Sequence, residues 1–202
     1  MTSLPAARAH PVLAERIPSV ALRDVLLISA GVLVVAASAQ IVIPLPFTPV
    51  PITGQTFGVL LTAAALGPAR GAMSMALYLV LGIAGLPIFL GGHSGLASAV
   101  GPTGGYLLGF VVAAWLVGAL ARRGLDRRPD GTALAFIVGS LAIYALGVPW
   151  LAVALRVSLP DAVKLGMLPF LLGDAVKAII AAGLLPLAWR LTGEGEHPAD
   201  GS

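Results

Sequence analysis

Two charged side chains interrupt the last long apolar stretch of the chain, at positions 168–191. Asp174 and Lys177 lie in its first third. A charge at the centre of a membrane-spanning helix costs about 2.5–3.5 kcal/mol, so such residues usually face the protein interior, form pairs and mark a site. A spacing of three residues places both side chains on one helix face. We interpret Asp174 and Lys177 as a ligand-binding pair. The alternative is a purely structural ion pair, since Asp161 and Lys164 share this spacing in a polar loop.

Other polar groups are candidate ligand contacts. Gln55 opens the second apolar stretch beside Thr53, and its primary amide can both donate and accept hydrogen bonds. The sequence supports equally a ligand contact by Gln55 and a helix start capped by Thr53. The hydroxyls of Tyr78, Tyr106 and Tyr144 are further candidate donors. Tyrosines near membrane interfaces are, however, more often anchors.

The sequence G-H-S-G, which begins at Gly92, fits the pattern of a serine nucleophile in intramembrane proteases. That chemistry needs a base held against Ser94. His93 is its sequence neighbour, and His10 and His197 lie in polar terminal segments, so we reject a protease. Gly92 and His93 remain candidate ligand contacts.

Several classes of chemistry are excluded by what the sequence lacks. There is no cysteine, no phosphate-binding G-x-x-x-x-G-K-[ST] motif and no metal-ligand spacing. We therefore expect no enzyme, no catalytic residue, no metal site, no cofactor and no ATP hydrolysis by this chain alone. The net charge is only +3, and basic residues flank the apolar stretches instead of clustering, which argues against nucleic acid as a partner.

Composition identifies the environment of these residues. Of 202 residues, 58% are hydrophobic and 10% are charged, whereas a soluble domain has roughly 25% charged residues. Six apolar stretches follow the first polar residues, at 25–43, 54–66, 72–89, 104–121, 133–155 and 168–191. A spanning helix needs roughly 20 residues, so the second stretch is short. We predict an all-α integral membrane protein, with a cytoplasmic tail at 1–23, a domain of six transmembrane helices at 24–192 and a cytoplasmic tail at 193–202.

Arginines and lysines indicate the orientation of the predicted helices. With the N-terminus inside, nine of them lie on the inner side: Arg8, Arg16, Arg23, Arg70, Arg122, Arg123, Arg127, Arg128 and Arg190. Only Arg156 and Lys164 lie on the outer side. This positive-inside bias predicts that both termini are cytoplasmic.

A signal peptide is the competing interpretation of the first apolar stretch. Arg23, an apolar core and the A-x-A site at Ala37-Ser38-Ala39 fit its pattern, and cleavage leaves five helices in the same orientation. The apolar run continues to Ile43, however, which is long for a signal core. We therefore favour an uncleaved helix.

Three segments on the predicted outer side are irregular. Residues 44–52 contain four prolines, which forbid a helix and favour extended backbone. Residues 91–105 are rich in glycine, and residues 156–166 connect the last two stretches. Non-helical backbone at membrane depth is tolerated only where it is buried in protein or lines a cavity. We predict a covered pocket that opens outward, with simple connecting loops as the alternative.

Small residues recur at helical spacing at Gly101, Gly105, Gly109 and Ala113. Such a ladder lets two helix backbones approach closely. We expect it to pack against another helix of the same chain.

Several of these segments resemble the BioY family. The motifs are T-P-V-P-I-T-G-Q-T at 48–56, L-Y-L at 77–79, G-L-P at 85–87, G-P-T-G-G-Y-L at 101–107 and P-F-L-L-G-D-A-V-K at 169–177. BioY is the biotin-binding S component of energy-coupling factor (ECF) transporters. The resemblance covers the first to the sixth apolar stretch and leaves out both tails.

The resemblance implies six helices, cytoplasmic termini and a biotin site near the outer face of a bacterial or archaeal cell (inner) membrane. It assigns ligand contacts to Asp174 and Lys177. It also implies a coupling transmembrane subunit and two ATPase subunits as partners, with function without these subunits as the alternative. The family's A-x-x-x-A spacing on the first helix is missing here, where small residues gather at Ala36–Ala39. An S component for another vitamin, and a proton- or ion-coupled carrier that uses Asp174, remain the alternatives.

Overall fold

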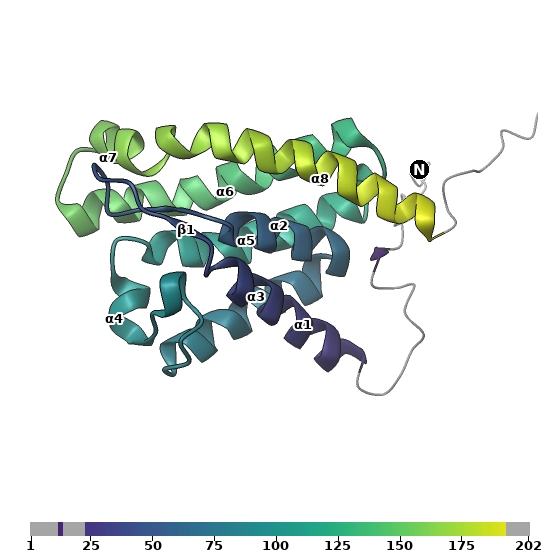
Figure 1. The fold of residues 1–202 in the computed structure, drawn as a ribbon, viewed down its shortest axis with the longest axis horizontal. Helices are drawn as coiled ribbons and strands as arrows, with labels where there is room; N and C mark the ends of the chain where they lie inside the picture. The colour runs from purple at the N-terminus through teal and green to yellow at the C-terminus, as the bar shows by residue number, and fades with distance from the viewer. Residues whose placement is uncertain (1–11, 14–22, 193–202) are drawn as a thin grey trace, which may run out of the picture.

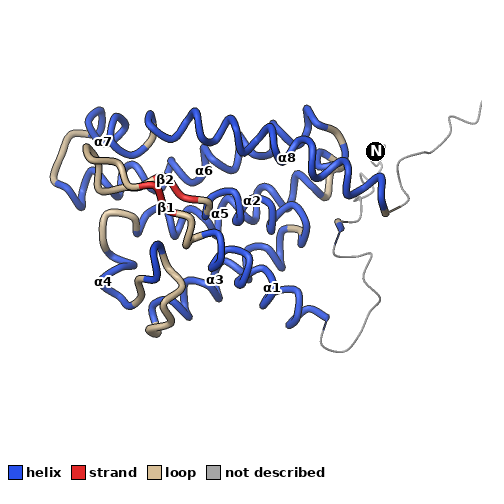
Figure 2. Tube along the Cα trace, viewed as in Figure 1, coloured by secondary structure: helices blue, strands red, loops and turns tan. Residues whose placement is uncertain are grey.

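The computed structural model describes residues 12–13 and 23–192, so the predicted tails lie almost wholly outside the described residues. The described part is a helical bundle with one small hairpin (Figures 1 and 2). Its elements, in chain order, are α1 (Arg23–Ser38), β1 (Val42–Ile43), β2 (Ile52–Thr53), α2 (Gln55–Leu66), α3 (Pro68–Ile83), η2 (Leu90–Gly92), α4 (Gly95–Val100), α5 (Gly104–Ala121), η3 (Leu125–Arg127), α6 (Pro129–Leu155), α7 (Leu159–Gly166), η4 (Leu168–Phe170) and α8 (Leu171–Leu191).

Six longer helices correspond to the six predicted apolar stretches, and two of them differ clearly in extent. The prediction that the first helix reaches Ile43 is wrong, because α1 ends at Ser38. Gln40 ends this helix by donating from its side-chain amide to the carbonyl of Ala36, at 2.9 Å. The third helix begins earlier than predicted, with Pro68 in its first turn, and ends at Ile83, before Gly85 with its φ of 110°.

The proline-rich segment contains no helix, as predicted, but it turns at residues 46–47 and bends at 49–50 instead of running extended throughout. Its two ends pair as the antiparallel strands β1 and β2, with Val42 opposite Thr53 and Ile43 opposite Ile52. Proline cannot donate to a strand ladder, so the ladder is confined to the residues that flank the prolines. The loop between the strands is carried at the end of the bundle where the other long loops gather (Figure 2).

The ladder of small residues packs within the chain, as predicted. A Cβ on Gly105 would lie 2.5 Å from the carbonyl oxygen of Leu146, and one on Gly109 would lie 2.9 Å from the Cα of Ile143. These distances leave no room for a side chain, so α5 and α6 pack backbone to backbone. Gly118 approaches the α2–α3 turn in the same way, since its Cβ would lie 2.4 Å from the carbonyl carbon of Gly67.

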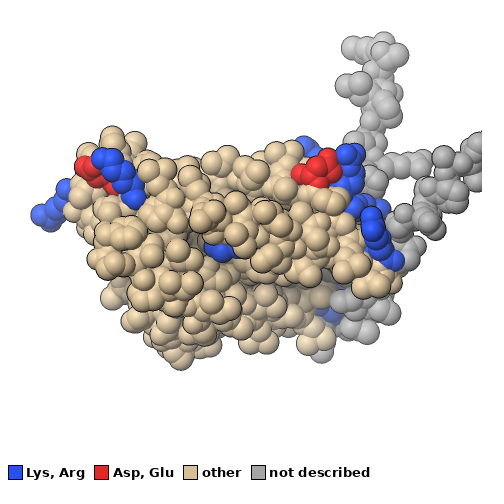
Figure 3. All heavy atoms as spheres, turned by 45° about the horizontal axis from the view of Figure 1, so that its top comes forward, with Lys and Arg blue, Asp and Glu red and all other residues tan. Residues whose placement is uncertain are grey.

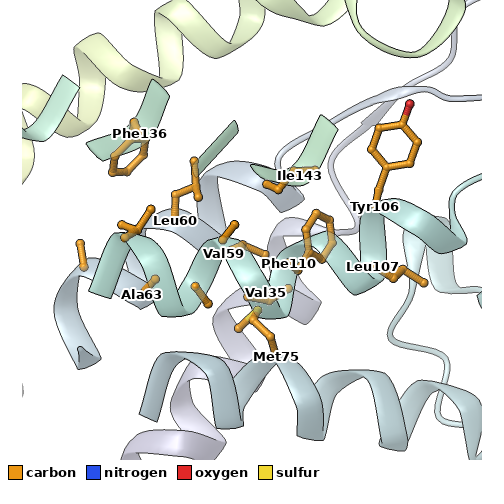
Figure 4. Packing of buried hydrophobic residues seen from close by; sticks show 14 of the residues in the cluster. Val35, Val59, Leu60, Ala63, Met75, Tyr106, Leu107, Phe110, Phe136 and Ile143 are labelled. Atoms are coloured by element: carbon orange, nitrogen blue, oxygen red, sulfur yellow. The ribbon is translucent and has the colours of Figure 1, made fainter. Parts of the chain in front are cut away.

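The core is centred on α5, which contacts α2, α3 and α6. Figure 4 shows how buried side chains from five helices meet there: Val35 of α1, Val59 and Leu60 of α2, Met75 of α3, Phe110 of α5, and Phe136 and Ile143 of α6. Helix α8 lies at the side of the bundle and packs along α6 (Figure 1). The stretch Leu159–Leu191, which contains α8, is the least covered of three long apolar helical stretches in the described residues, with 22% of its most apolar window buried.

The surface is that of a membrane protein. Among the described residues, three helical stretches are long and apolar enough to cross a membrane: Gly104–Ala121, Pro129–Leu155 and Leu159–Leu191. Large apolar side chains such as Leu33, Leu172 and Ile179 are exposed on the outside of the bundle. In Figure 3 the charged side chains gather mainly at the two ends of the molecule, and the broad band between them is almost free of charged residues. Lipid is the natural solvent for such a band.

Candidate functional site

A cavity of about 260 Å³ lies at the end of the bundle that carries the irregular segments. This volume is slightly below the range of roughly 300–1,000 Å³ that is usual for small-molecule sites. Its lining comes from segments far apart in sequence: parts of 49–56 and of 97–107, then Phe89, Leu90 and His93, Phe110 of α5, Ile143 and Tyr144 of α6, Phe170, and Asp174 and Lys177 of α8. The predicted covered pocket is therefore present.

Asp174 and Lys177 share one face of α8 and both line the cavity, as their spacing indicated. Their side chains form an ion pair, with 3.3 Å between Lys177 Nζ and Asp174 Oδ1. The side chains are 12% and 18% exposed, whereas those of Asp161 and Lys164 in α7 are 53% and 67% exposed. An exposed pair contributes little to stability, whereas solvent screens the charges of a largely buried pair much less.

Two further residues complete the hydrogen bonding of this pair. The hydroxyl of Tyr144 on α6 donates to Asp174 Oδ2. Lys177 Nζ also donates to Thr56 Oγ1 at the start of α2, at 2.7 Å. The pair thus connects α2, α6 and α8 at the floor of the cavity, and each carboxylate oxygen has one donor.

Gln55 is buried in the wall next to this network, with 6% of its surface exposed. Its Nε2 donates to the hydroxyl of Tyr78 at 2.7 Å, and that hydroxyl donates to the carbonyl of Ile88 at 2.8 Å. Tyr78 therefore fixes the amide from behind and does not line the cavity itself. The prediction that Thr53 caps α2 is off by one position, since Gly54 is the N-cap; the hydroxyl of Thr53 accepts from the N–H of Gln55 at 3.2 Å.

The last residues of α7 are held by two hydroxyls from other parts of the chain. Tyr106 of α5 donates to the carbonyl of Gly166 at 2.7 Å, and Thr48 of the proline loop donates to the carbonyl of Leu165 at 2.9 Å. The Thr48 hydroxyl also accepts from the N–H of Val50, which lines the cavity. These bonds fix the proline loop over the site. The rings of Tyr106 and Tyr144 meet edge to face, with 6.5 Å between centroids, and form an aromatic wall.

The glycine-rich segment contributes less than its composition suggests. His93 lines the cavity and is exposed at its mouth, with 2.7 Å between its Nδ1 and the carbonyl oxygen of Leu90. Gly92 is not part of the lining. The N–H groups of Gly91, Gly92 and His93 all donate to backbone carbonyls, so these three are not free to hold a ligand.

The structure also places residues in the cavity that the sequence did not single out as ligand contacts. Thr56 is the most important of them, because it binds Lys177 across 121 positions of sequence. Other residues of this kind include Ser98 of α4, Thr103, Phe110, Ile143 and Phe170. No signal in a single sequence indicates which residue lies opposite Lys177, since that contact depends on how α2 and α8 pack.

This arrangement fits reversible binding of a small molecule that both donates and accepts hydrogen bonds. Asp174 is an acceptor, Lys177 is a donor, Gln55 supplies an amide, and aromatic rings provide apolar walls. In the described part of the chain there is no group of three or more side chains that would hold a metal ion.

Comparison with known proteins agrees with this description. Residues 10–194 match the sequence profile of the BioY family. The Biotin transporter BioY of Rhizobium etli is 34% identical over 168 residues, which cover 79% of this chain and 89% of the relative. The Probable biotin transporter BioY of Pyrococcus horikoshii is 37% identical, with 85% and 97% covered. The Biotin transporter BioY of Thermotoga maritima is 38% identical, with 77% and 90% covered.

A solved structure has the same fold. The crystal structure of the S-component for biotin from an ECF-type ABC transporter superposes with a TM-score of 0.73 at 26% sequence identity, and the match covers 88% of this chain and 96% of that chain. The sequence match spans nearly the whole chain, the fold is shared, and three of the motifs on which the resemblance was based, at 48–56, 101–107 and 169–177, contribute to the lining of the cavity. The chain belongs to the BioY family.

Proposed function

We propose that this protein binds biotin in the cavity above Asp174 and Lys177 and is the substrate-binding S component of an ECF-type uptake system. The observation that carries the proposal is the half-enclosed Asp174–Lys177 pair, completed by Tyr144 and Thr56, at the floor of a cavity of about 260 Å³. The relatives named biotin transporters and the solved S-component for biotin support the choice of ligand.

Biotin offers groups that match this floor. An N–H of its cyclic urea would donate to Asp174, and Lys177 would donate to the urea carbonyl. The fused rings would lie against Tyr106 and Tyr144. The carboxylate end would point to the mouth, near His93; the N–H groups of Gly91, Gly92 and His93 would not hold it, because they donate to backbone carbonyls. A ligand without these groups would leave the buried partners unpaired, at about 1–3 kcal/mol each, which makes such a site selective.

The membrane arrangement follows from the same proposal. Helices α1, α2, α3, α5, α6 and α8 would each span the bilayer, with both termini in the cytoplasm and the cavity facing outward. At 1.5 Å per residue α2 is only about 18 Å long, against a hydrocarbon core of roughly 30 Å. It would therefore depend on the hairpin and the neighbouring helices to complete its span. The excess of arginine at the α2–α3 and α5–α6 turns supports this orientation in the cell (inner) membrane.

Mass spectrometry of the ligand that co-purifies with the detergent-solubilised protein tests the choice of ligand. Biotin is expected in the released fraction. Riboflavin, thiamine or another vitamin in its place would contradict binding of biotin and would identify the protein as an S component for that vitamin.

Uptake by cells that cannot synthesise biotin tests the energy source. With ATPase and coupling subunits co-expressed, we expect uptake that persists when a protonophore dissipates the proton gradient. Uptake that stops with the gradient and needs no ATPase would instead support a carrier in which Asp174 relays protons.

A further inference from the structure

A second hollow runs along the outside of the bundle between α6 and α8. It has a volume of about 570 Å³ and an almost entirely apolar lining. Its walls are Pro129, Ala133, Phe136, Ile137, Ser140 and Leu141 of α6, and Leu171, Ala175, Ala178, Ile179, Ala182 and Gly183 of α8, with Tyr144 and Asp174 at its inner end. We call it the α6–α8 groove.

The groove is long and is not filled by the chain. From Pro129 to Tyr144 it follows 16 residues of α6, or about 22 Å of helix, which exceeds the roughly 15 Å of hydrocarbon in one leaflet. Ile137 and Ile179 on its rims are 52% and 71% exposed. A Cβ on Gly183 would have no heavy atom within 4 Å, so this wall faces open space.

One end of the groove has a basic rim. Arg128 directly precedes Pro129, and Arg190 lies seven residues after Gly183, two turns further along the same face of α8. Both arginines are exposed. The two helix ends are held together, since Trp189 Nε1 donates to Asp126 Oδ2 at 2.6 Å.

The other end of the groove is closed by Tyr144 and Asp174, which are the two residues that line both this groove and the ligand cavity. The groove is thus apolar along its length, basic at one end and closed at the other. Arg128 donates to both carboxylate oxygens of Asp130, from Nε at 3.1 Å and from Nη2 at 2.8 Å. Both side chains are more than two-thirds exposed, so solvent screens this pair, and the guanidinium keeps further donors.

We propose that the α6–α8 groove binds one acyl chain of an anionic phospholipid, whose headgroup lies between Arg128 and Arg190. The apolar walls fit the chain, and the two arginines complement the negative headgroup at the level where the helices leave the hydrocarbon. This site goes beyond the proposed function, and its occupancy does not require biotin.

Native mass spectrometry of the full-length, delipidated protein tests the site. The protein is titrated separately with phosphatidylglycerol and phosphatidylcholine that carry identical acyl chains. One tightly retained lipid and a clear preference for the anionic phosphatidylglycerol are expected. Equal retention of the two lipids would overturn the proposal.

Charge variants test the rim. In Arg128→Gln and Arg190→Gln the preference for phosphatidylglycerol should fall about fivefold for each arginine removed, with neutral lipid retained as before. Arg156→Gln, at the opposite end of α6, is the matched control and should leave the preference unchanged. An equal fall in the control would mean that net charge, and not this rim, attracts the lipid, and would contradict the proposal.

Filling variants test the groove. Gly183→Leu should reduce retention of both lipids severalfold by occupying the chain site, and Ala175→Leu provides a second filling variant if the first is poorly expressed. Gly173→Leu is the matched control, because Gly173 also lies on α8 with no heavy atom within 4 Å of a Cβ but is not part of the lining. Unchanged retention in both filling variants would overturn the assignment of the chain to this groove.

Discussion

At the scale of single residues, the central feature is a charged pair whose partners come from other helices. Asp174 receives a hydrogen bond from Tyr144, and Lys177 donates to Thr56. Each charge is therefore oriented before a ligand arrives, which lowers the entropy lost on binding. The pair joins α8 to α2 and α6, so it also fixes the shape of the cavity.

Asp174→Asn should weaken biotin binding roughly ten- to a hundredfold, because a hydrogen bond to a charged group contributes about 1.5–3 kcal/mol. The thermal unfolding temperature should change little, since asparagine has nearly the same shape. A binding titration measures the effect. Asp161→Asn is the control: it breaks an exposed pair of the same spacing and should bind biotin normally. Equal affinity of Asp174→Asn and Asp161→Asn for biotin would show that Asp174 does not contact the ligand.

Thr56→Val should weaken biotin binding severalfold by releasing Lys177, whereas Thr56→Ser should bind nearly as tightly as the wild type because it keeps the hydroxyl. The expected loss corresponds to one hydrogen bond, about 1 kcal/mol, or roughly a fivefold change in Kd. Comparison of the two variants separates the effect of the hydroxyl, which positions Lys177, from the effect of side-chain packing at Thr56. If serine does not restore affinity, the hydroxyl is not the group that matters.

At the scale of elements, helices were easier to predict than the segments between them. The bounds of α5 agree with the apolar stretch 104–121, because glycine and arginine mark its two ends. The end of α1 was missed because it depends on one side-chain contact of Gln40. Helix α4 lies inside the segment read as a glycine loop; its six residues are too few for a periodic pattern.

In the candidate site, too, residues marked by a local sequence signal were easier to predict than contacts between distant segments. Asp174 and Lys177 were found because charge is rare in an apolar stretch, and that signal is local. The pairing of β1 with β2, and of Thr56 with Lys177, depends on which elements pack together in three dimensions. Gly92 was named from its motif alone, and the structure places it outside the cavity lining.

The close approach of α5 and α6 gives a stability prediction. Gly109→Ala should destabilise the bundle by about 1–3 kcal/mol, because its Cβ would collide with the backbone at Ile143. Gly183→Ala is the matched control in open space and should be neutral or stabilise by up to about 1 kcal/mol through helix propensity. Thermal unfolding in detergent measures both. Similar unfolding temperatures for the two variants would contradict the packing described for α5.

The proline loop gives a kinetic prediction. Thr48→Val removes the hydrogen bond to Leu165 while keeping the side chain's shape, so the loop should open more often and biotin should dissociate about fivefold faster. Stopped-flow displacement measures the dissociation rate. Phe47→Ala changes an exposed neighbour that does not line the cavity and serves as the control. A dissociation rate that does not change in Thr48→Val would show that this bond does not hold the loop closed.

At the scale of the whole molecule, an apolar band separates two charged ends, and the cavity lies at one of them. The absence of cysteine makes the proposed orientation directly testable. A single cysteine at Ser158, in the α6–α7 turn, should react with a membrane-impermeant maleimide in intact cells. One at Thr192, after α8, should react only after permeabilisation. The reverse pattern would contradict cytoplasmic termini.

The measurement that tests the central claim most directly is a calorimetric titration of biotin into the ligand-free, purified protein, repeated with riboflavin and thiamine as competitors. We predict saturable binding of biotin at one site per chain and no displacement by either competitor. No saturable binding of biotin, or displacement by one of the other vitamins, would contradict the assignment of this cavity to biotin.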